Sequence, residues 1–245
     1  MERWFLFIIW KLNPSVGLFG NHLNIIYEIL KEGSAMPEER EEKAFYIKAY
    51  YKNLEQRISF LKELHEDGHV NEALMLCCCY IEALGSQRYQ DSDRKAKNYC
   101  TILDEHGGDV IFGLVHPKRA LQVLSTVNLF QRNIVEIQEA ISGIENQLYE
   151  KRAFLQLLAP VTTPEQQNWL NENVFKLTIA AISYDHVRCQ LVHDISAGPV
   201  SFSETTFNGK PLPSIEFRLL YKGLKNVFAK AKCKSIETNK WYWEQ

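Results

Sequence analysis

The segment from Thr163 to His193 has the most demanding pattern in this 245-residue chain, because two stripes of apolar side chains run along it at helical spacing. Steps of three and four residues connect the first stripe, which comprises Leu170, Val174, Leu177, Ala181, Tyr184 and Arg188. The same steps connect the second stripe, which comprises Phe175, Ile179, Ile182, His186, Cys189 and His193. The pattern predicts one long helix that is buried on two faces and ends in polar and charged groups.

Helical spacing also dominates the rest of the chain. We expect further helices over Pro37–Asp67, Asn71 to about Ser86, a segment capped by Ser92 and Asp93 and ended by Gly107, Pro117 to about Val127, Ile134–Leu158, and Phe217 onward. The second of these is apolar nearly all round, which predicts a central position. Between Ser201 and Phe217 the apolar period falls towards two, around the turn pair Asn208-Gly209. The sequence therefore predicts an all-α helical bundle with a long motif-bearing helix and a small irregular β-hairpin before the C-terminal helix.

The first 36 residues differ in pattern from the remainder. They include the apolar run Trp4–Trp10, which is too short to span a bilayer and lacks the small-residue cleavage site of a signal peptide. We expect a packed strand or helix turn there, with an interfacial membrane anchor as the alternative. With 46% hydrophobic residues, the chain can bury a substantial core. We therefore expect an N-terminal apolar extension over residues 1–36, a helical domain over residues 37–245, and no membrane partner.

Charge and cysteine content limit the partners and the compartment. A formal net charge of -2 excludes a globally basic nucleic-acid binder, so a polyanion site would need local clustering. Lysines cluster on one face of the last helix, where Lys222, Lys225 and Lys232 form either a weak RNA-binding surface or an ordinary solvated face. The adjacent cysteines Cys77–Cys79 cannot pair with one another on a helix, which favours a reducing, cytoplasmic setting.

Charged groups gather at the end of the long helix. A buried arginine is costly unless something pairs it, and Arg188 could pair with Asp185, with Glu82, with a ligand or with a second subunit. His193 could bind carbonyl groups at the helix end or carry a proton. The sequence leaves these alternatives open for each residue taken alone.

Together, these residues resemble a known family. The segment Arg188-Cys-Gln-Leu-Val-His193, with Tyr184 one turn earlier, resembles the motif of the HEPN superfamily, the "higher eukaryotes and prokaryotes nucleotide-binding" domain. The upstream segment Ala73–Gly85 is similar to a central helix of such proteins. The resemblance implies an all-helical bundle, a homodimer whose motif helices face each other, and frequently a metal-independent ribonuclease that acts as a host-defence toxin. A nucleotidyltransferase-type antitoxin is then a candidate partner, and no cofactor is expected.

The chemistry of RNA cleavage fits the same residues. Without a metal, cleavage needs a base for the 2′-hydroxyl, an acid for the leaving 5′-oxygen, and a cation for the charge that builds on phosphorus. His193 suits either proton role and Arg188 suits the stabilising role. Residues five apart on an α-helix diverge by about 140°, so we expect a second copy to complete the site unless the helix ends near His193. The supporting candidates are Glu82, Tyr184, Asp185, Cys189 and Asp194.

Three rival interpretations remain. Cys189 replaces the polar residue, commonly asparagine, that follows the arginine in active family members, and this favours a catalytically inactive nucleotide- or protein-binding module. His193-Asp194 and the segment His65–His69 indicate a metal phosphohydrolase of the His-Asp type, but that class needs a later aspartate and none follows Asp194. His186, Cys189 and His193 also have the spacing of zinc ligands, although no fourth ligand is evident nearby.

Overall fold

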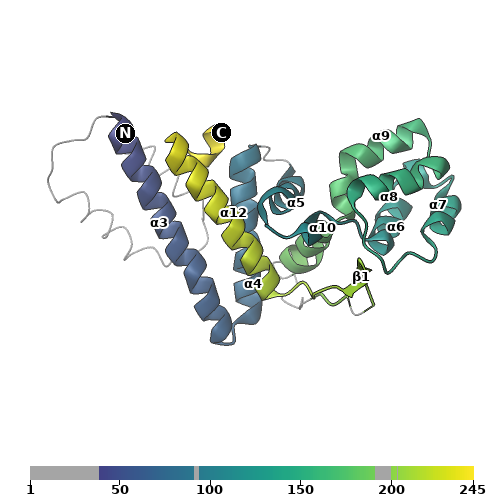
Figure 1. Ribbon diagram of the computed structural model, residues 1–245, viewed down its shortest axis with the longest axis horizontal. Coiled ribbons are helices and arrows are strands. Elements are labelled where there is room, and N and C mark those ends of the chain that lie inside the picture. The colour runs from purple at the N-terminus through teal and green to yellow at the C-terminus, as the bar shows by residue number, and fades with distance from the viewer. Residues whose placement is uncertain (1–38, 91–93, 191–199, 203) are drawn as a thin grey trace. The chain divides into compact units, whose positions relative to one another are not determined.

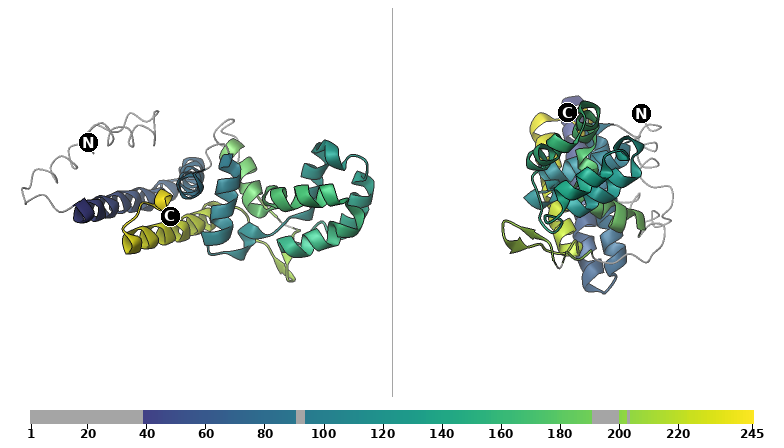
Figure 2. Two further views of the ribbon diagram at one scale, coloured as in Figure 1. Left: turned by 90° about the horizontal axis from the view of Figure 1, so that it is seen from above. Right: turned by 90° about the vertical axis from the view of Figure 1, so that its right-hand side faces the viewer.

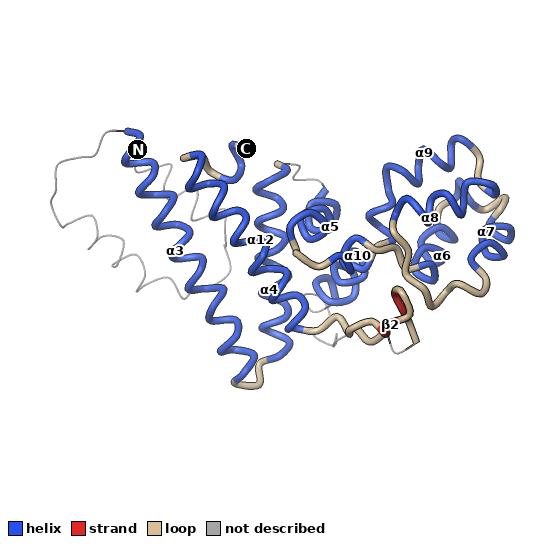
Figure 3. The backbone as a smooth tube through the Cα atoms, viewed as in Figure 1, coloured by secondary structure: helices blue, strands red, loops and turns tan. Residues whose placement is uncertain are grey.

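Helices dominate the computed structural model, which describes residues 39–90, 94–190, 200–202 and 204–245 (Figure 1). The elements, in chain order, are α3 (Glu39–Glu66), α4 (Val70–Tyr89), α5 (Lys95–His106), η2 (Val110–Gly113), α6 (Pro117–Thr126), η3 (Asn128–Phe130), α7 (Ile134–Ile141), α8 (Lys151–Leu158), η4 (Ala159–Val161), α9 (Pro164–Asn173), η5 (Val174–Leu177), α10 (Ile179–Ile182), η6 (Ser183–Cys189), β1 (Thr206–Phe207), β2 (Lys210–Pro211), α12 (Phe217–Thr238) and η7 (Tyr242–Glu244). Within the described ranges, strands occur only in one small hairpin (Figure 3). The fold is all-α, as the periodicity predicts.

Residues Lys43–Gln245 form one compact unit. No helix in the described part of the chain is long and apolar enough to cross a membrane. Several residues that the sequence singles out lie outside the described residues, namely Trp4–Trp10, Ser92, Asp93, His193 and Asp194.

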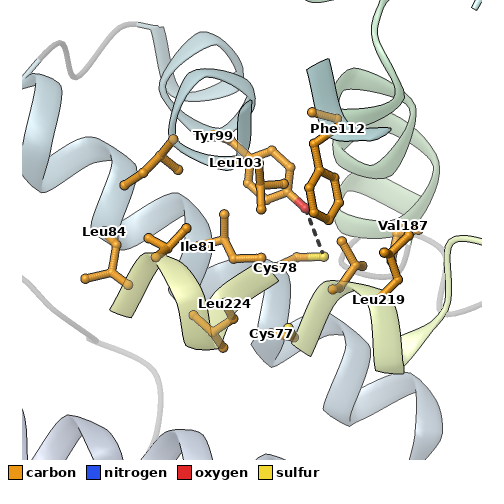
Figure 4. Packing of buried hydrophobic residues seen from close by; sticks show 14 of the residues in the cluster. Cys77, Cys78, Ile81, Leu84, Tyr99, Leu103, Phe112, Val187, Leu219 and Leu224 are labelled. Carbon is orange, nitrogen blue, oxygen red and sulfur yellow. Dashed lines mark hydrogen bonds between the residues drawn. The ribbon is translucent and has the colours of Figure 1, made fainter. Parts of the chain in front are cut away.

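Helix α4 lies at the centre of the larger core, in agreement with its all-round apolar character. It packs against α5 and α12, and α3 runs beside α12 (Figures 1 and 2). Gly85 permits the close approach of α5, because a β-carbon at this position would lie 2.7 Å from the carbonyl oxygen of Asn98. Figure 4 shows the Tyr99 hydroxyl directed at Cys78, with 3.5 Å between oxygen and sulfur. The same hydroxyl lies 3.1 Å from the Ser183 hydroxyl, so this buried polar group is satisfied.

A second, separate core belongs to helices α6 to α9, which we call the α6–α9 module (residues 117–177). Its core consists of Val115, just before the module, and the buried side chains of Ala120, Leu124, Phe130, Ile137, Ile141, Phe154, Leu158, Leu170 and Leu177. The chain passes between the larger core and the module twice, at residues 114–116 and 177–179, and we call these two segments the crossings. The crossings pair with each other, because the His116 amide donates to the Leu177 carbonyl and the Ile179 amide donates to the Leu114 carbonyl, both over 3.0 Å.

The prediction of a single long helix over Thr163–His193 is wrong, because the described part of this segment is divided into shorter helical elements. The described part of this segment contains α9, η5, α10 and η6 in turn, and the chain becomes extended at Thr178, with φ -89° and ψ 165°. The Thr178 hydroxyl accepts a hydrogen bond from the Ala181 amide over 3.4 Å and so caps the start of α10. Leu177 belongs to the smaller core and Ile179 to the larger one. The break therefore sends the two halves of the first stripe into different cores, whereas Phe175 of the second stripe packs against the larger core together with Ile179 and Ile182.

The helix expected over Ile134–Leu158 is also interrupted, because residues 142–150 separate α7 from α8. Gly143 has a φ of 84°, a conformation that favours glycine. Farther along this stretch the Leu148 amide donates to the carbonyl of Thr206 in β1 over 3.0 Å. The apolar side chains of residues 142–150 keep helical spacing, but the glycine turn and the pairing with the hairpin prevent a continuous helix there.

The expected hairpin and the final helix are confirmed. Strand β1 pairs antiparallel with β2, and Phe207 lies opposite Lys210. Asn208 and Gly209 form the turn with φ angles of 51° and 72°, the two positive values that a type I′ turn requires. The buried face of α12 includes Phe217, Leu220, Leu224, Phe228 and Ala231.

Candidate functional site around helix η6

The motif segment Ser183–Cys189 forms a π-helix, η6. Hydrogen bonds in a π-helix join residues five apart, which widens the turn, and such segments are rare and often occur at functional sites. Helix η6 packs against α4 and α5, with Ser183 and Val187 buried. Figure 4 shows Val187 in the same core as Leu219 and Phe112.

Arg188 pairs with Glu82 of α4. Its Nε lies 2.7 Å from Oε2 of Glu82, out of hydrogen-bond alignment, and its Nη2 donates to Oε1 over 3.3 Å. The Arg188 and Glu82 side chains are 20% and 12% exposed, so water screens the pair only partly. Burial is the largest influence on Arg188 and opposes its charge, but the Glu82 carboxylate, Tyr184 and Cys189 together outweigh burial and raise the arginine pKa above its ordinary value. Of the two pairings within the chain that the sequence left open, the one with Glu82 is therefore found.

Tyr184 supports the same guanidinium. Its ring centre lies 5.5 Å from Cζ of Arg188, which is within cation–π range. The ring also packs against Tyr99, with 5.2 Å between the ring centres. Burial, followed by the charge of Glu82, raises the pKa of Tyr184 to about 12. The phenol is therefore neutral at physiological pH and acts as a platform for Arg188.

Cys189 follows the arginine and is half-buried. Burial raises the pKa of its thiol, and the charge and hydrogen bond of Arg188 offset this only in part. Burial likewise raises the thiol pKa of Cys79 on α4, next to Glu82 and Arg188. Both groups remain neutral thiols at physiological pH, whereas a nucleophile or a metal ligand would need the thiolate. Nowhere in the described ranges do three or more histidine, cysteine, aspartate or glutamate side chains gather as a metal-binding group.

Asp185 pairs with Arg119 of α6 and not with Arg188. The Asp185 side chain is 44% exposed and that of Arg119 is 18% exposed. Residues 119 and 185 are 66 positions apart, so no local pattern could have revealed Arg119 as a component of this site. A second ion pair, between Lys151 of α8 and Asp104 of α5, joins the α6–α9 module to the larger core.

The structure thus brings Glu82, Tyr184, Arg188 and Cys189 together, and Asp185 connects this group to α6. The three lysines proposed from the sequence as an RNA-binding surface are elsewhere, on α12. Lys222 pairs with Asp109 over 3.5 Å, Lys232 pairs with Glu55 over 2.7 Å, and Lys225 lies 4.9 Å from the ring centre of Tyr221. Lys225 and Lys232 also line a groove of about 610 Å³ between α3 and α12. Carboxylates thus neutralise two of these three lysines.

No protein-family model, no curated protein and no solved structure matches this chain. The site must therefore be interpreted from its own chemistry. Glu82 engages the Nε and Nη2 side of Arg188, and a guanidinium has a second edge, formed by its two terminal nitrogens, that can bind two oxygens of a phosphate or carboxylate. The arrangement at η6 is thus suited to binding an anion.

Proposed function

We propose that this chain is a metal-independent endoribonuclease of the HEPN type and part of a host-defence or toxin–antitoxin system. Arg188 stabilises the negative charge on the reacting phosphate, and His193 carries the proton. RNA is the substrate, no cofactor is required, and the cytoplasm is the setting. A nucleotidyltransferase-type antitoxin is the corresponding partner.

The observation that carries this proposal is the support around Arg188. Glu82 holds one side of the guanidinium, the Tyr184 ring lies 5.5 Å from it, and both contacts are partly screened from water. An arginine that is already oriented loses less conformational freedom when it binds phosphate, and such preorganisation favours stabilisation of a transition state. The π-helical geometry of η6 adds support, because π segments often occur at functional sites.

The proposed reaction needs proton transfer at two oxygens. A base removes the proton from the 2′-hydroxyl, the 2′-oxygen attacks phosphorus, and the bond from phosphorus to the 5′-oxygen breaks as that oxygen receives a proton. The products are a 2′,3′-cyclic phosphate and a 5′-hydroxyl. His193 performs one of these transfers, and its equivalent in a second copy is suited to the other. The proposal therefore includes a homodimer whose η6 segments face each other.

Cleavage assays with matched variants test this proposal. Purified protein should cut single-stranded RNA in the presence of a chelator, leave a 2′,3′-cyclic phosphate, and spare DNA, which lacks the attacking 2′-hydroxyl. His193→Ala should lower the rate by about 10²- to 10⁴-fold, and Arg188→Ala should also abolish measurable cutting. His186→Ala, in the same segment, and Arg152→Ala, exposed on α8, are the controls and should retain activity. Activity that survives in both Arg188→Ala and His193→Ala would exclude this mechanism.

The second candidate is a catalytically inactive module that binds a nucleotide or a protein through Arg188. Two observations favour it: Glu82 already neutralises Arg188, and Cys189 occupies the motif position that is usually polar. Such a module would bind RNA or nucleotide, and Arg188→Ala would weaken that binding, yet the wild-type protein would leave a broad RNA panel uncut. That result would replace the ribonuclease proposal with the binding module.

A further inference from the structure

Arg119 reaches helix η6 from outside the larger core. It lies in the first turn of α6, within the α6–α9 module, and its Nη2 contacts Oδ2 of Asp185 in η6. Asp185 comes three residues before Arg188, and its charge, like that of Glu82, adds to the rise that burial causes in the pKa of the Cys189 thiol. Two arginines, each paired with one carboxylate, therefore flank the same helical segment.

The stability of helix α6 does not explain why its first turn carries the positively charged Arg119. The N-terminal end of a helix carries partial positive charge, so basic residues in the first turn are unfavourable there. The first turn of α6 nevertheless contains both Lys118 and Arg119 and no acidic residue. Lys118 is exposed and has no ion pair within the described part of the chain. Asp185 is therefore the carboxylate that balances this basic turn.

The pair between Arg119 and Asp185 is also easy to exchange. The Asp185 side chain is 44% exposed, so water competes for its carboxylate and lowers the net free energy of the pair, while the Arg119 side chain is 18% exposed. The Nη2 of Arg119 contacts Oδ2 of Asp185 and is the donor that a ligand would meet there, whereas the Nε is buried and has no hydrogen-bond partner. A phosphate oxygen accepts hydrogen bonds from guanidinium in the same geometry as a carboxylate does. A phosphate group can therefore take the place of Asp185 without loss of hydrogen bonds.

We infer that Arg119 is a second phosphate-binding residue for single-stranded RNA at η6, and that Asp185 competes with the RNA backbone for it. This inference rests on the proposed RNA-binding function, but it does not require cleavage. It assigns to the α6–α9 module the task of contacting a backbone phosphate next to the one held by Arg188. Asp185 acts here as an intramolecular competitor, and its removal should strengthen RNA binding.

The inference predicts opposite effects for the two halves of one ion pair. In the His193→Ala background, which prevents cutting, the affinity for a short fluorescent single-stranded RNA should fall about tenfold in Arg119→Gln, by loss of one charged contact worth about 1.4 kcal/mol. The slope of log affinity against log salt concentration should also become shallower by about 0.7. Asp185→Asn should bind RNA more tightly than the background protein, with an unchanged or steeper slope. A purely structural pair predicts weaker binding in both variants.

The other ion pair of the module supplies the matched control. Lys151→Gln and Asp104→Asn remove a bridge between the same module and the larger core that includes no residue of η6, and should leave RNA affinity unchanged. Thermal melting of all four variants checks that each is folded. If Asp185→Asn fails to strengthen binding, or if the background protein binds no RNA, the inference is overturned. RNA that binds with the expected pattern but is never cut by the wild-type protein would overturn the ribonuclease proposal alone.

Discussion

The ion pair between Arg188 and Glu82 should contribute measurably to stability. Glu82→Gln keeps the shape of the side chain but leaves the mostly buried Arg188 without its counter-charge. Removal of one partner from a fully buried pair costs about 3–5 kcal/mol, and a hydrogen bond to a charged group contributes about 1.5–3 kcal/mol. Because the Arg188 side chain is 20% exposed, water compensates in part, and we expect a loss of about 2 kcal/mol. At about 2–4 °C per kcal/mol, the melting temperature should fall by about 4–8 °C.

A double-mutant cycle isolates the pair from other effects of each substitution. Glu82→Gln, Arg188→Met and the double variant should be unfolded with urea at neutral pH, since Met keeps an unbranched side chain over Tyr184. We expect a coupling free energy of about 1.5–2 kcal/mol that decreases only slightly in high salt. A coupling below about 0.5 kcal/mol, the value typical of exposed pairs, would show that the pair is solvated and that Glu82 does not orient Arg188.

Three further predictions concern the parts of the fold that position this site. Burial, and then the charge of Lys118, lower the pKa of His116 in the folded protein. The contribution of neutral His116 to folding stability is therefore fully present above the unfolded pKa of about 6.5 and is lost as the pH falls through the lower folded pKa. Acid should therefore lower the melting temperature more in the wild type than in His116→Gln. Gly85→Ala should destabilise the protein by about 1–3 kcal/mol in urea unfolding, because the new β-carbon would collide with the carbonyl of Asn98 on α5, and an unchanged midpoint would contradict the close packing of α4 and α5. Thr178→Val should cost about 1 kcal/mol by loss of the α10 cap, and equal stability of Thr178→Val and wild type would show that the cap is not needed.

Strong local signals in the sequence predicted most of the helices correctly. Helix α4 is central because apolar residues surround it, and the Asn208-Gly209 pair forms the hairpin turn because both residues tolerate positive φ. The two wrong predictions were the continuous helices across Thr178 and Gly143. In both cases the apolar period continues through the break, so periodicity alone gave no warning. Thr178 is nevertheless a residue type that favours helix starts, and Gly143 one that favours left-handed turns, so composition carried a weak signal.

In the candidate site, too, contacts between residues close in sequence could be predicted, whereas contacts between residues far apart in sequence could not. The spacing of Tyr184 and Arg188 by four residues was enough to predict that they would be neighbours, and the ring does lie 5.5 Å from the guanidinium. Glu82 and Asp185 were the two candidate counter-charges within the chain, and sequence spacing did not decide between them. Arg119 had no sequence signal at all, because its contact depends on how the α6–α9 module meets the larger core.

The order of apolar and polar residues by itself determined that this chain is helical, where its central helix lies, and which residues share the motif turn, because each of these depends on neighbours within about two helical turns. Tertiary structure alone decided which carboxylate neutralises Arg188. A charge within a protein pairs with the partner that burial and packing bring within reach. Helix α4 places Glu82 next to Arg188, and α6 places Arg119 next to Asp185. The widened π geometry of η6 also became visible only in the tertiary structure, where η6 packs against α4 and α5, because the sequence pattern there is equally compatible with an α-helix.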